Sequence, residues 1–468
     1  MVFADLIFLY LFLPLNLVLY YLFKSRTYRN FILTVFSLFF YAWGEPVWVV
    51  LLIISALVDY INGLVIERCR GEMGADLALL SSLVINLGLL CSFKYSGLIV
   101  ASINSLFSTS FDVPSFALPI GISFYTFQTL SYTIDVYRGE VKPQRSFAKF
   151  LLFVSLYHQL VAGPIVRYSE IGERIENRHE NWADVSKGVD RFVIGLAKKT
   201  IVANTAGRIA APYIAAENIS SLSTVGAWFG IVLFALQIYY DFSGYSDMAI
   251  GLGQMFGFSH PENFRYPYIA RGAAEFWRRW HITLGSFFRD YIYIPLGGNR
   301  SKMVRNLLIT WFVTGLWHGA SWNFVIWGVY YGVLILLERL FLEKLFGILP
   351  RIFSHIYFIL IMLIGWVFFC FTELPAAIKF LGRMFFIGGP VYDISVGLDI
   401  AGCAIWLALS IIFCMPVSVW LGRRLEKAPQ GVQNGVAAVR PLFNISLIFI
   451  CTCMLVGQSY NPFLYFRF

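Results

Sequence analysis

The stretch LLITWFVTGLWHGASWNFVIWGVYYGVLILL, residues 307–337, runs for 31 residues without a single Asp, Glu, Lys or Arg. About 20 mostly apolar residues are enough to cross the hydrocarbon core of a bilayer, so this run indicates a membrane-embedded helix. Its one histidine, His318, stands near the middle of the run. We therefore expect an imidazole near the centre of the membrane, where ionisable side chains are costly and mark functional sites.

The composition of the whole chain agrees with a membrane location. Of the 468 residues 58% are hydrophobic and only 13% are charged, whereas soluble domains carry about 25% charge. So few charges could not cover a soluble protein of this size. The net charge of +9 is typical of basic cytoplasmic loops, so we expect membrane lipids and no nucleic acid among the partners. We predict an all-α polytopic membrane protein, with residues 1–468 forming one membrane-embedded domain and no separate soluble domain.

Apolar segments recur along the chain and predict about ten or eleven transmembrane helices, although several are too short or too broken to be simple crossings. The candidate spans are residues 2–23, 31–43, 47–66, 77–93, 118–136, 150–166, 225–240, 307–337, 356–371, 398–419 and 442–456. No Lys or Arg precedes Lys24, so the first segment lacks the basic start of a cleavable signal peptide and is expected to be retained. Basic residues follow the first, third and fifth segments, which predicts an extracytoplasmic N-terminus.

Three regions interrupt the apolar pattern. Residues 158–164 (HQLVAGP) form a poor helix centre and predict a re-entrant or broken segment. Residues 167–199 are mixed in charge and predict a cytoplasmic loop that leads into an interfacial helix. Residues 262–305 carry eight Lys or Arg among dense aromatic residues, and large apolar side chains recur at helical spacing from Phe276 to Tyr291. This pattern favours an amphipathic helix that lies in the membrane interface.

His318 is the strongest candidate for chemistry, because the imidazole pKa suits proton transfer near neutrality. Gly315 and Gly319 would leave space beside the ring for a substrate or for a closely packed helix. The alternative is a neutral histidine that bonds to a backbone carbonyl inside the bundle. His281, among basic and aromatic neighbours, is by position alone more typical of a solvated residue. His158 is a weak candidate for a cavity.

Asp241 and Asp247 follow an apolar segment closely and are expected near membrane depth. Such a carboxylate could orient a histidine, bind a cation or pair with an arginine. Walker-type phosphate loops, His-Glu-x-x-His and Gly-x-Ser-x-Gly motifs are missing from the sequence, which disfavours an ATP-driven pump or a hydrolase built on them. Cys451-x-Cys453 has no second Cys or His pair nearby, so we expect no metal site.

Several longer motifs lie along the chain. They are LPIGISFY at 118–125, YDFSGYSDMAIG at 240–251, NFRYPY at 263–268, EFWRRWH at 275–281, DYIYIPLGGNR at 290–300, WHGA at 317–320 and PFLYF at 462–466. Together these motifs resemble the membrane-bound O-acyltransferase family, and within it the bacterial alginate O-acetyltransferase branch. The likeness covers nearly the whole chain. One departure is His158, which stands where related chains more often have Pro.

The resemblance implies a ring of helices around a tunnel, in a bacterial inner-membrane protein. It implies an acetyl donor on the cytoplasmic side, such as acetyl-CoA or another acyl thioester, with no bound cofactor. It also implies His318 as the catalytic base and His281 as a second functional histidine. Further candidates for binding the substrate or donor are Arg278, Arg279, Trp280, Trp317, Asp241, Tyr245 and Asp247. Arg278 and Arg279 could hold a phosphate-bearing donor or, equally, anchor the chain to anionic lipids.

The expected function is therefore O-acetylation of an exported polysaccharide such as alginate, with a separate extracytoplasmic acetyltransferase as a partner. Whether His318 acts as a base or as an acylated nucleophile is open at this point. Two alternatives are acylation of teichoic acid or peptidoglycan and, in another class, a secondary transporter with His318 as a proton relay. Transporters often contain two related halves, and no such pairing is visible in this chain.

Overall fold

The computed structural model describes residues 1–161 and 163–457, and within these ranges all regular structure is helical except one isolated β-bridge between Phe264 and Trp280. The predicted all-α polytopic fold is confirmed. The chain divides into two compact units. The first contains residues 1–195 and 245–261, and the second contains residues 196–244 and 262–457. The closing PFLYF motif and Ala162 lie outside the described residues.

The first unit begins with a short π-helical segment, Phe8–Phe12, that continues into the first α-helix. Its α-helices are α1 (Leu13–Leu22), α2 (Arg26–Gly44), α3 (Trp48–Arg68), α4 (Met73–Leu90), α5 (Ser96–Phe107), α6 (Ile122–Arg138), α7 (Phe147–Ser155), α8 (Tyr157–Leu160), α9 (Tyr168–Asn177) and α10 (Trp182–Ala197). The predicted break within residues 158–164 is confirmed, because regular helix ends with α8. Residues 167–199 form two helices, α9 and α10, where we expected a loop leading into one helix.

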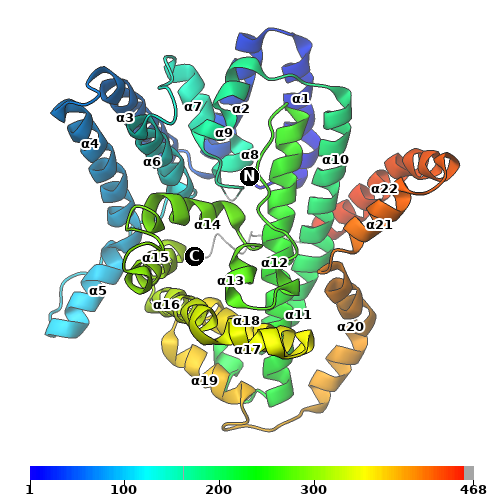
Figure 1. Ribbon diagram of the computed structural model, residues 1–468. Helices are drawn as coiled ribbons and strands as arrows, with labels where there is room; N and C mark the ends of the chain where they lie inside the picture. The colour runs from blue at the N-terminus through cyan, green and yellow to red at the C-terminus, as the bar shows by residue number, and fades with distance from the viewer. Residues whose placement is uncertain (162, 458–468) are drawn as a thin grey trace. The chain divides into compact units, whose positions relative to one another are not determined.

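Helices α3, α4 and α6 pack against one another in the first unit (Figure 1). Their shared interior contains a fully buried carboxyl group, Asp59, which accepts hydrogen bonds from Ser82 Oγ at 2.5 Å and Asn86 Nδ2 at 2.8 Å. Ser82 also contacts Thr133 Oγ1 at 3.0 Å, and Ser55 Oγ donates to Asn86 Oδ1. Polar side chains that bond across helices stabilise membrane bundles, so this cluster fixes the three-helix packing.

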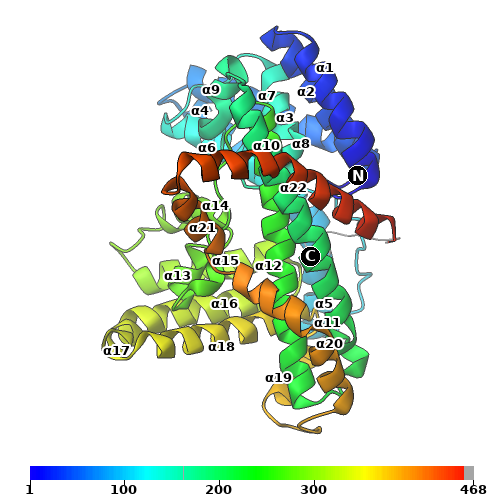
Figure 2. The ribbon, with the colours of Figure 1, turned by 90° about the vertical axis from the view of Figure 1, so that its right-hand side faces the viewer.

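The longest helix, α12 (Thr224–Met255), is shared by both units, and its residues 224–244 belong to the second unit. The other α-helices of the second unit are α11 (Asn204–Ile214), α13 (Ala273–Trp277), α14 (Ile282–Phe288), α15 (Met303–His318), α16 (Trp322–Leu337), α17 (Glu343–Ile348), α18 (Arg351–Cys370), α19 (Leu374–Met384), α20 (Ile394–Phe413), α21 (Val417–Glu426) and α22 (Gln430–Val456). Helix α16 packs between α15 and α18 (Figure 2).

Among the described residues, seven helices are long and apolar enough to cross a membrane, fewer than the ten or eleven expected. They are Trp48–Arg68, Met73–Phe107, Thr224–Met255, Trp322–Ile348, Arg351–Cys370, Ile394–Phe413 and Gln430–Val456, and Phe8–Leu22 is a shorter apolar helix. The run at 307–337 is divided into two helices, α15 and α16. Expected spans at 31–43 and 118–136 fall in α2 and α6, which are less apolar than the seven because they carry many polar side chains.

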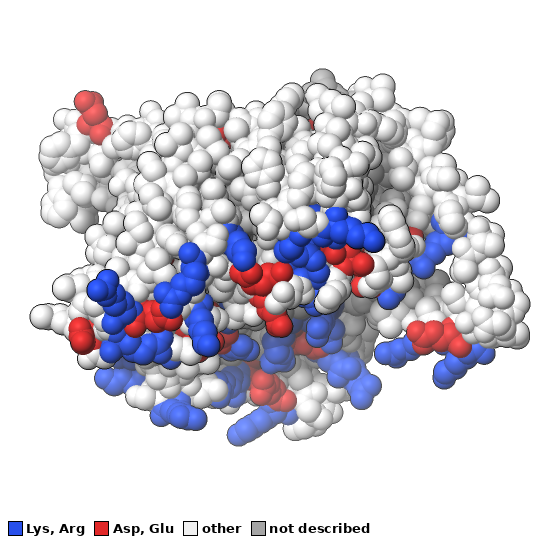
Figure 3. Space-filling view, turned by 90° about the horizontal axis from the view of Figure 1, so that it is seen from above, with Lys and Arg blue, Asp and Glu red and all other residues white. Residues whose placement is uncertain are grey.

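Charge and exposure follow the pattern of a membrane protein. In the space-filling view, most of the Lys, Arg, Asp and Glu side chains visible on this face lie in its lower part, and the upper part is largely uncharged (Figure 3). Many large apolar side chains are exposed. In α20 and α22 only 11% of the apolar window is buried by the rest of the chain. Such surfaces are suited to lipid rather than to water.

Candidate active site

His318 is the last residue of α15, so it stands at a turn rather than in the middle of a continuous span. Gly319 is extended, and α16 begins only after Ser321, whose hydroxyl caps the backbone N–H of Asn323. Ser321 Oγ also donates to the carbonyl of Thr372 at 2.8 Å, and Asn323 Nδ2 donates to the carbonyl of Phe371 at 2.5 Å. The expected uninterrupted helix over 307–337 is therefore wrong, and the turn that holds His318 is tied to the end of α18.

The two helices of this hairpin approach closely because glycines face each other. A Cβ on Gly328 would lie 2.3 Å from the carbonyl oxygen of Trp311 and 2.9 Å from Gly315 Cα. A Cβ on Gly315 would lie 2.4 Å from the carbonyl oxygen of Phe324. The glycines near His318 were expected to leave space either for a substrate or for a closely packed helix, and the structure shows close helix packing. Small residues allow such an approach between membrane helices.

The imidazole of His318 lies among aromatic rings. It is only 3% exposed, and the ring centroids of Trp317, Trp327 and Phe369 lie 4.9, 4.8 and 5.4 Å from its own, each nearly perpendicular to it. Surrounded by these rings, the histidine has little contact with water.

His281 is buried and held in an unusual backbone conformation. It is 1% exposed, with φ 45° and ψ 54°, and it precedes the first residue of α14. The expected continuous amphipathic helix is wrong here, because α13 ends at Trp277 and a non-glycine residue with positive φ cannot continue a right-handed helix. Such strained positions cluster at functional sites. The solvated position considered for His281 is also wrong.

Asn263 fixes the protonation pattern of His281. The Asn263 side-chain oxygen lies 3.1 Å from His281 Nδ1 and also accepts from the backbone N–H and the hydroxyl of Thr283. Because a backbone N–H can only donate, the atom that it meets on Asn263 is the amide oxygen, and His281 Nδ1 therefore carries the proton. Nε2 is left as an acceptor, buried and without a hydrogen-bond partner among the described residues. Burial lowers the pKa of His281 to about 3, which keeps the ring neutral.

The indole of Trp317 packs against both histidines. Its ring centroid lies 6.0 Å from that of His281 and 4.9 Å from that of His318. The structure thus brings both predicted histidines to the same residue. Trp280, by contrast, packs in an aromatic core with Phe264, Tyr268 and Trp366.

A cavity of about 410 Å³ lies beside His281. Its wall consists of Ala274, Trp277, Arg278, His281, Ile282, Leu284, Gly285, Ser286, Phe288, Arg289, Tyr293, Leu307, Thr310, Trp311 and Thr314. His318 is one helical turn beyond Thr314. The two arginines give the mostly apolar wall a positive charge, which suits a ligand with an acyl chain and phosphate groups.

Of the two arginines that the sequence singled out, only Arg278 lines this cavity. The guanidinium of Arg279 pairs with Glu275 at 2.8 Å and donates to the carbonyl of Arg265. Arg289 replaces it in the wall and also pairs with Asp290. The role of Arg289 in the cavity wall could not be predicted from the sequence, because the prediction treated Phe276 to Tyr291 as one continuous helix.

The predicted carboxylates of α12 form ion pairs. Asp241 Oδ1 lies 2.6 Å from Lys199 Nζ, with both side chains buried in the second unit. Asp247 Oδ1 lies 2.9 Å from Arg191 in the first unit. Tyr245, also in the first unit, stacks on Phe3.

A second buried histidine pair lies in the first unit. His158 Nδ1 and His260 Nε2 are 2.7 Å apart, and both rings pack against Phe258. Nothing in the sequence around His260 predicts its contact with His158. The structure buries His260, with an exposed fraction of 6%.

The comparisons with known proteins agree on one family. A sequence profile of the membrane-bound O-acyltransferase family (MBOAT) matches residues 138–372. The chain is 38% identical to the probable alginate O-acetylase AlgI of Pseudomonas putida, with 100% of both chains covered. It is 33% identical to the peptidoglycan O-acetyltransferase of Helicobacter pylori, with 82% of this chain and 79% of that one covered.

A more distant relative is the teichoic acid D-alanyltransferase of Bacillus subtilis, which is 28% identical over 52% of this chain and 67% of its own. The profile match spans α13 to α16 and so includes both histidines and the cavity. On this evidence the chain belongs to the membrane-bound O-acyltransferase family and is an O-acyltransferase.

Proposed function

We propose that the protein takes an acetyl group from a cytoplasmic thioester donor and passes it, through a tunnel, to a hydroxyl group of an exported polysaccharide such as alginate. The observation that carries this proposal is a pair of buried histidines that both pack against Trp317, one of which, His281, lines a cavity with two arginines. The alginate acceptor is supported by the similarity to AlgI along the full length of both chains.

In the proposed reaction, neutral His318 accepts the proton of the acceptor hydroxyl while its oxygen attacks the thioester carbonyl. A C–O bond forms, the C–S bond breaks, and the proton passes from the imidazolium to the departing thiolate. General-base assistance of this kind contributes about 10²–10⁴-fold. The aromatic rings around His318 exclude water, which would otherwise hydrolyse the thioester.

His281 and the arginines serve the donor in this proposal. His281 lines the cavity and its Nε2 is an acceptor, so it can accept a hydrogen bond from an N–H group of the donor. Arg278 and Arg289 bind the phosphate groups of acetyl-CoA or of another phosphate-bearing thioester. The protein resides in the inner membrane with its N-terminus extracytoplasmic, and a separate extracytoplasmic acetyltransferase acts with it on the polymer.

Peptidoglycan is the second candidate acceptor, because the Helicobacter pylori relative bears the name of a peptidoglycan O-acetyltransferase. Teichoic acid is less favoured, since the relatives with that name are matched over about half of this chain. The transporter alternative is set aside because the family consists of acyltransferases.

The test is transfer of radiolabelled acetyl groups from acetyl-CoA by the purified protein in nanodiscs, with periplasmic extract and either alginate or peptidoglycan. We expect labelled alginate from the wild type and none from His318→Ala, which should remain folded. His179→Ala is the matched control, because that histidine is exposed and lies in the first unit. Unchanged transfer by His318→Ala would remove His318 from the mechanism, and labelling of peptidoglycan alone would identify the other acceptor.

A further inference from the structure

A pocket of about 540 Å³ lies in the first unit, between the start of α2 and the segment that joins α9 to α10. It is separate from the cavity beside His281 and has no part in the proposed transfer. Its charged wall residues are Lys24, Arg26, Arg29, Arg178, Glu176 and Glu180.

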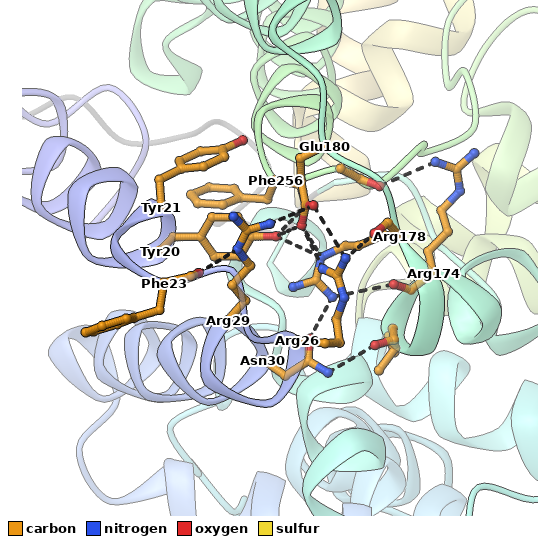
Figure 4. A network of polar contacts seen from close by, with 12 residues as sticks. Tyr20, Tyr21, Phe23, Arg26, Arg29, Asn30, Arg174, Arg178, Glu180 and Phe256 are labelled. Carbon is orange, nitrogen blue, oxygen red and sulfur yellow. Dashed lines mark hydrogen bonds and ion pairs between the residues drawn. The ribbon is translucent and has the colours of Figure 1, made fainter.

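One carboxylate, that of Glu180, forms ion pairs with the three arginines of the pocket wall. Glu180 lies 2.7 Å from Arg26, 2.7 Å from Arg29 and 3.5 Å from Arg178 (Figure 4). The other carboxylate, Glu176, pairs with Lys149, which is not part of the pocket wall. The pocket therefore has more positive than negative charge, and a bound anion would balance it.

Arg178 makes this excess costly, because its side chain is fully buried. Its Nε donates to Tyr20 and its Nη1 donates to Asn30 at 2.6 Å, whereas its Nη2 has no hydrogen-bond partner among the described residues. The guanidinium lies 4.6 Å from the ring centroid of Phe258, which stabilises a cation only in part. Buried cations without full compensation are strongly unfavourable, so the pocket favours an anionic ligand.

The surroundings of the pocket indicate where that anion comes from. Lys24 is exposed and follows directly after Leu22 and Phe23, which are apolar side chains with exposed fractions of 59% and 55%. Trp182, with an exposed fraction of 76%, stacks on Tyr21 at 5.6 Å. Tryptophan, tyrosine and basic residues collect at the border between the hydrocarbon core and the headgroups. The pocket thus lies where apolar surface gives way to charge.

We propose that this pocket binds a phosphate group, with Lys24 and Arg26 as the accessible cations. Lysine and arginine are the usual phosphate ligands in proteins. The position at the membrane border favours the headgroup of an anionic phospholipid as the source, and free phosphate is the other source with the same chemistry. The bound phosphate compensates Arg178 through the network around Glu180 and stabilises the packing of α1, α2 and α9.

The experiment compares nanodiscs of phosphatidylcholine with nanodiscs that also contain phosphatidylglycerol, and measures the unfolding temperature and the lipid retained per protein by native mass spectrometry. We expect phosphatidylglycerol to raise the unfolding temperature. Lys24→Gln should lower its retention about fivefold, the effect of one basic residue near an anionic surface. Because Lys24 is exposed, the variant should unfold like the wild type in phosphatidylcholine alone.

Lys142→Gln is the matched control, since Lys142 is an exposed lysine of the same unit outside the pocket. Inorganic phosphate added to phosphatidylcholine nanodiscs forms the second arm of the experiment. Stabilisation of the wild type but not of Lys24→Gln by inorganic phosphate alone would support the site and identify free phosphate as its ligand. Equal losses in Lys24→Gln and Lys142→Gln, or no stabilisation by either ligand, would overturn the proposal.

Discussion

At the scale of single residues, the contact between Asn263 and His281 is open to a direct test. A carboxylate at position 263 can accept the same three hydrogen bonds, but its charge favours the protonated imidazole and raises the pKa of His281. If the reaction needs neutral His281, Asn263→Asp should be active at high pH. As the pH is lowered, this variant should lose activity at a higher pH than the wild type does. The measurement is acetyl transfer as a function of pH.

Asn263→Ala provides the comparison, because it removes the acceptor without adding a charge. We expect a lower rate with no shift of the acid limb toward higher pH. An Asn263→Asp profile that coincides with that of the wild type would show that the protonation of His281 does not limit the reaction.

Arg278 and Arg279 are neighbours in sequence with different surroundings. Arg278→Gln should raise the KM for acetyl-CoA by about tenfold or more, since hydrogen bonds to charged groups contribute about 1.5–3 kcal/mol. Arg279→Gln should change it little, because Arg279 is outside the cavity wall and pairs with Glu275. Steady-state kinetics with varied donor concentration measures both. An equal rise in the two variants would assign the donor to both arginines, as the sequence suggested.

At the scale of elements, the hairpin of α15 and α16 positions His318 by close packing at its glycines. Gly328→Ala places a methyl group against the backbone of α15, and overpacking of this kind costs about 1–3 kcal/mol. We expect a lower unfolding temperature and reduced transfer. Gly435→Ala is the matched control, because a Cβ there meets nothing within 4 Å and alanine favours a helix. A Gly328→Ala variant as stable and active as the wild type would contradict the role of the close packing.

The buried pair of Lys199 and Asp241 supports a second element, α12. Removal of one partner takes a close opposite charge away from the other and costs about 3–5 kcal/mol, whereas an apolar pair of similar volume is often neutral. Lys199→Met should therefore unfold at a much lower temperature than the double variant Lys199→Met/Asp241→Leu. Transfer by the double variant then separates two roles. A stable but inactive protein would place Asp241 in the chemistry, and a stable and active one would confine the pair to structure.

At the scale of the molecule, Glu180 makes the first unit sensitive to acid. Burial alone would raise the pKa of Glu180, but the bonds from Arg26 and Tyr20 and the charges of Arg26 and Arg29 lower it from 4.5 to about 2. A lowered pKa in the folded state gives stability that is present above about pH 4.5 and is lost as the pH falls toward 2. We expect Glu180→Gln to unfold at a lower temperature than the wild type at pH 7, with a difference that shrinks below pH 4.5. A difference that is constant with pH would contradict this.

The family, the all-α membrane fold and the candidate histidines could be predicted from the sequence, because long motifs and long apolar runs are properties of the sequence itself. The turn at Gly319 was missed because the whole run is uncharged and long enough for one helix, although Gly319 and the capping residue Ser321 are a signal for a break. The conformation of His281 was also hidden, because its neighbours follow helical spacing. Asn263 and His260 are distant in sequence from the histidines that they contact, and such pairing is visible only in the folded chain.

The exposed apolar faces of α20 and α22 have a consequence for every measurement proposed above. A helix whose apolar face is buried so little by its own chain is solvated mainly by the surrounding lipid or detergent. The surrounding amphiphile therefore acts as a ligand of the native state, and a change of detergent shifts unfolding by mass action as a change of ligand would. The unfolding temperature of this protein therefore depends on the surrounding lipid or detergent as well as on the chain. The unfolding temperatures of a variant and of the wild type can be compared only when both are measured in the same lipid or detergent.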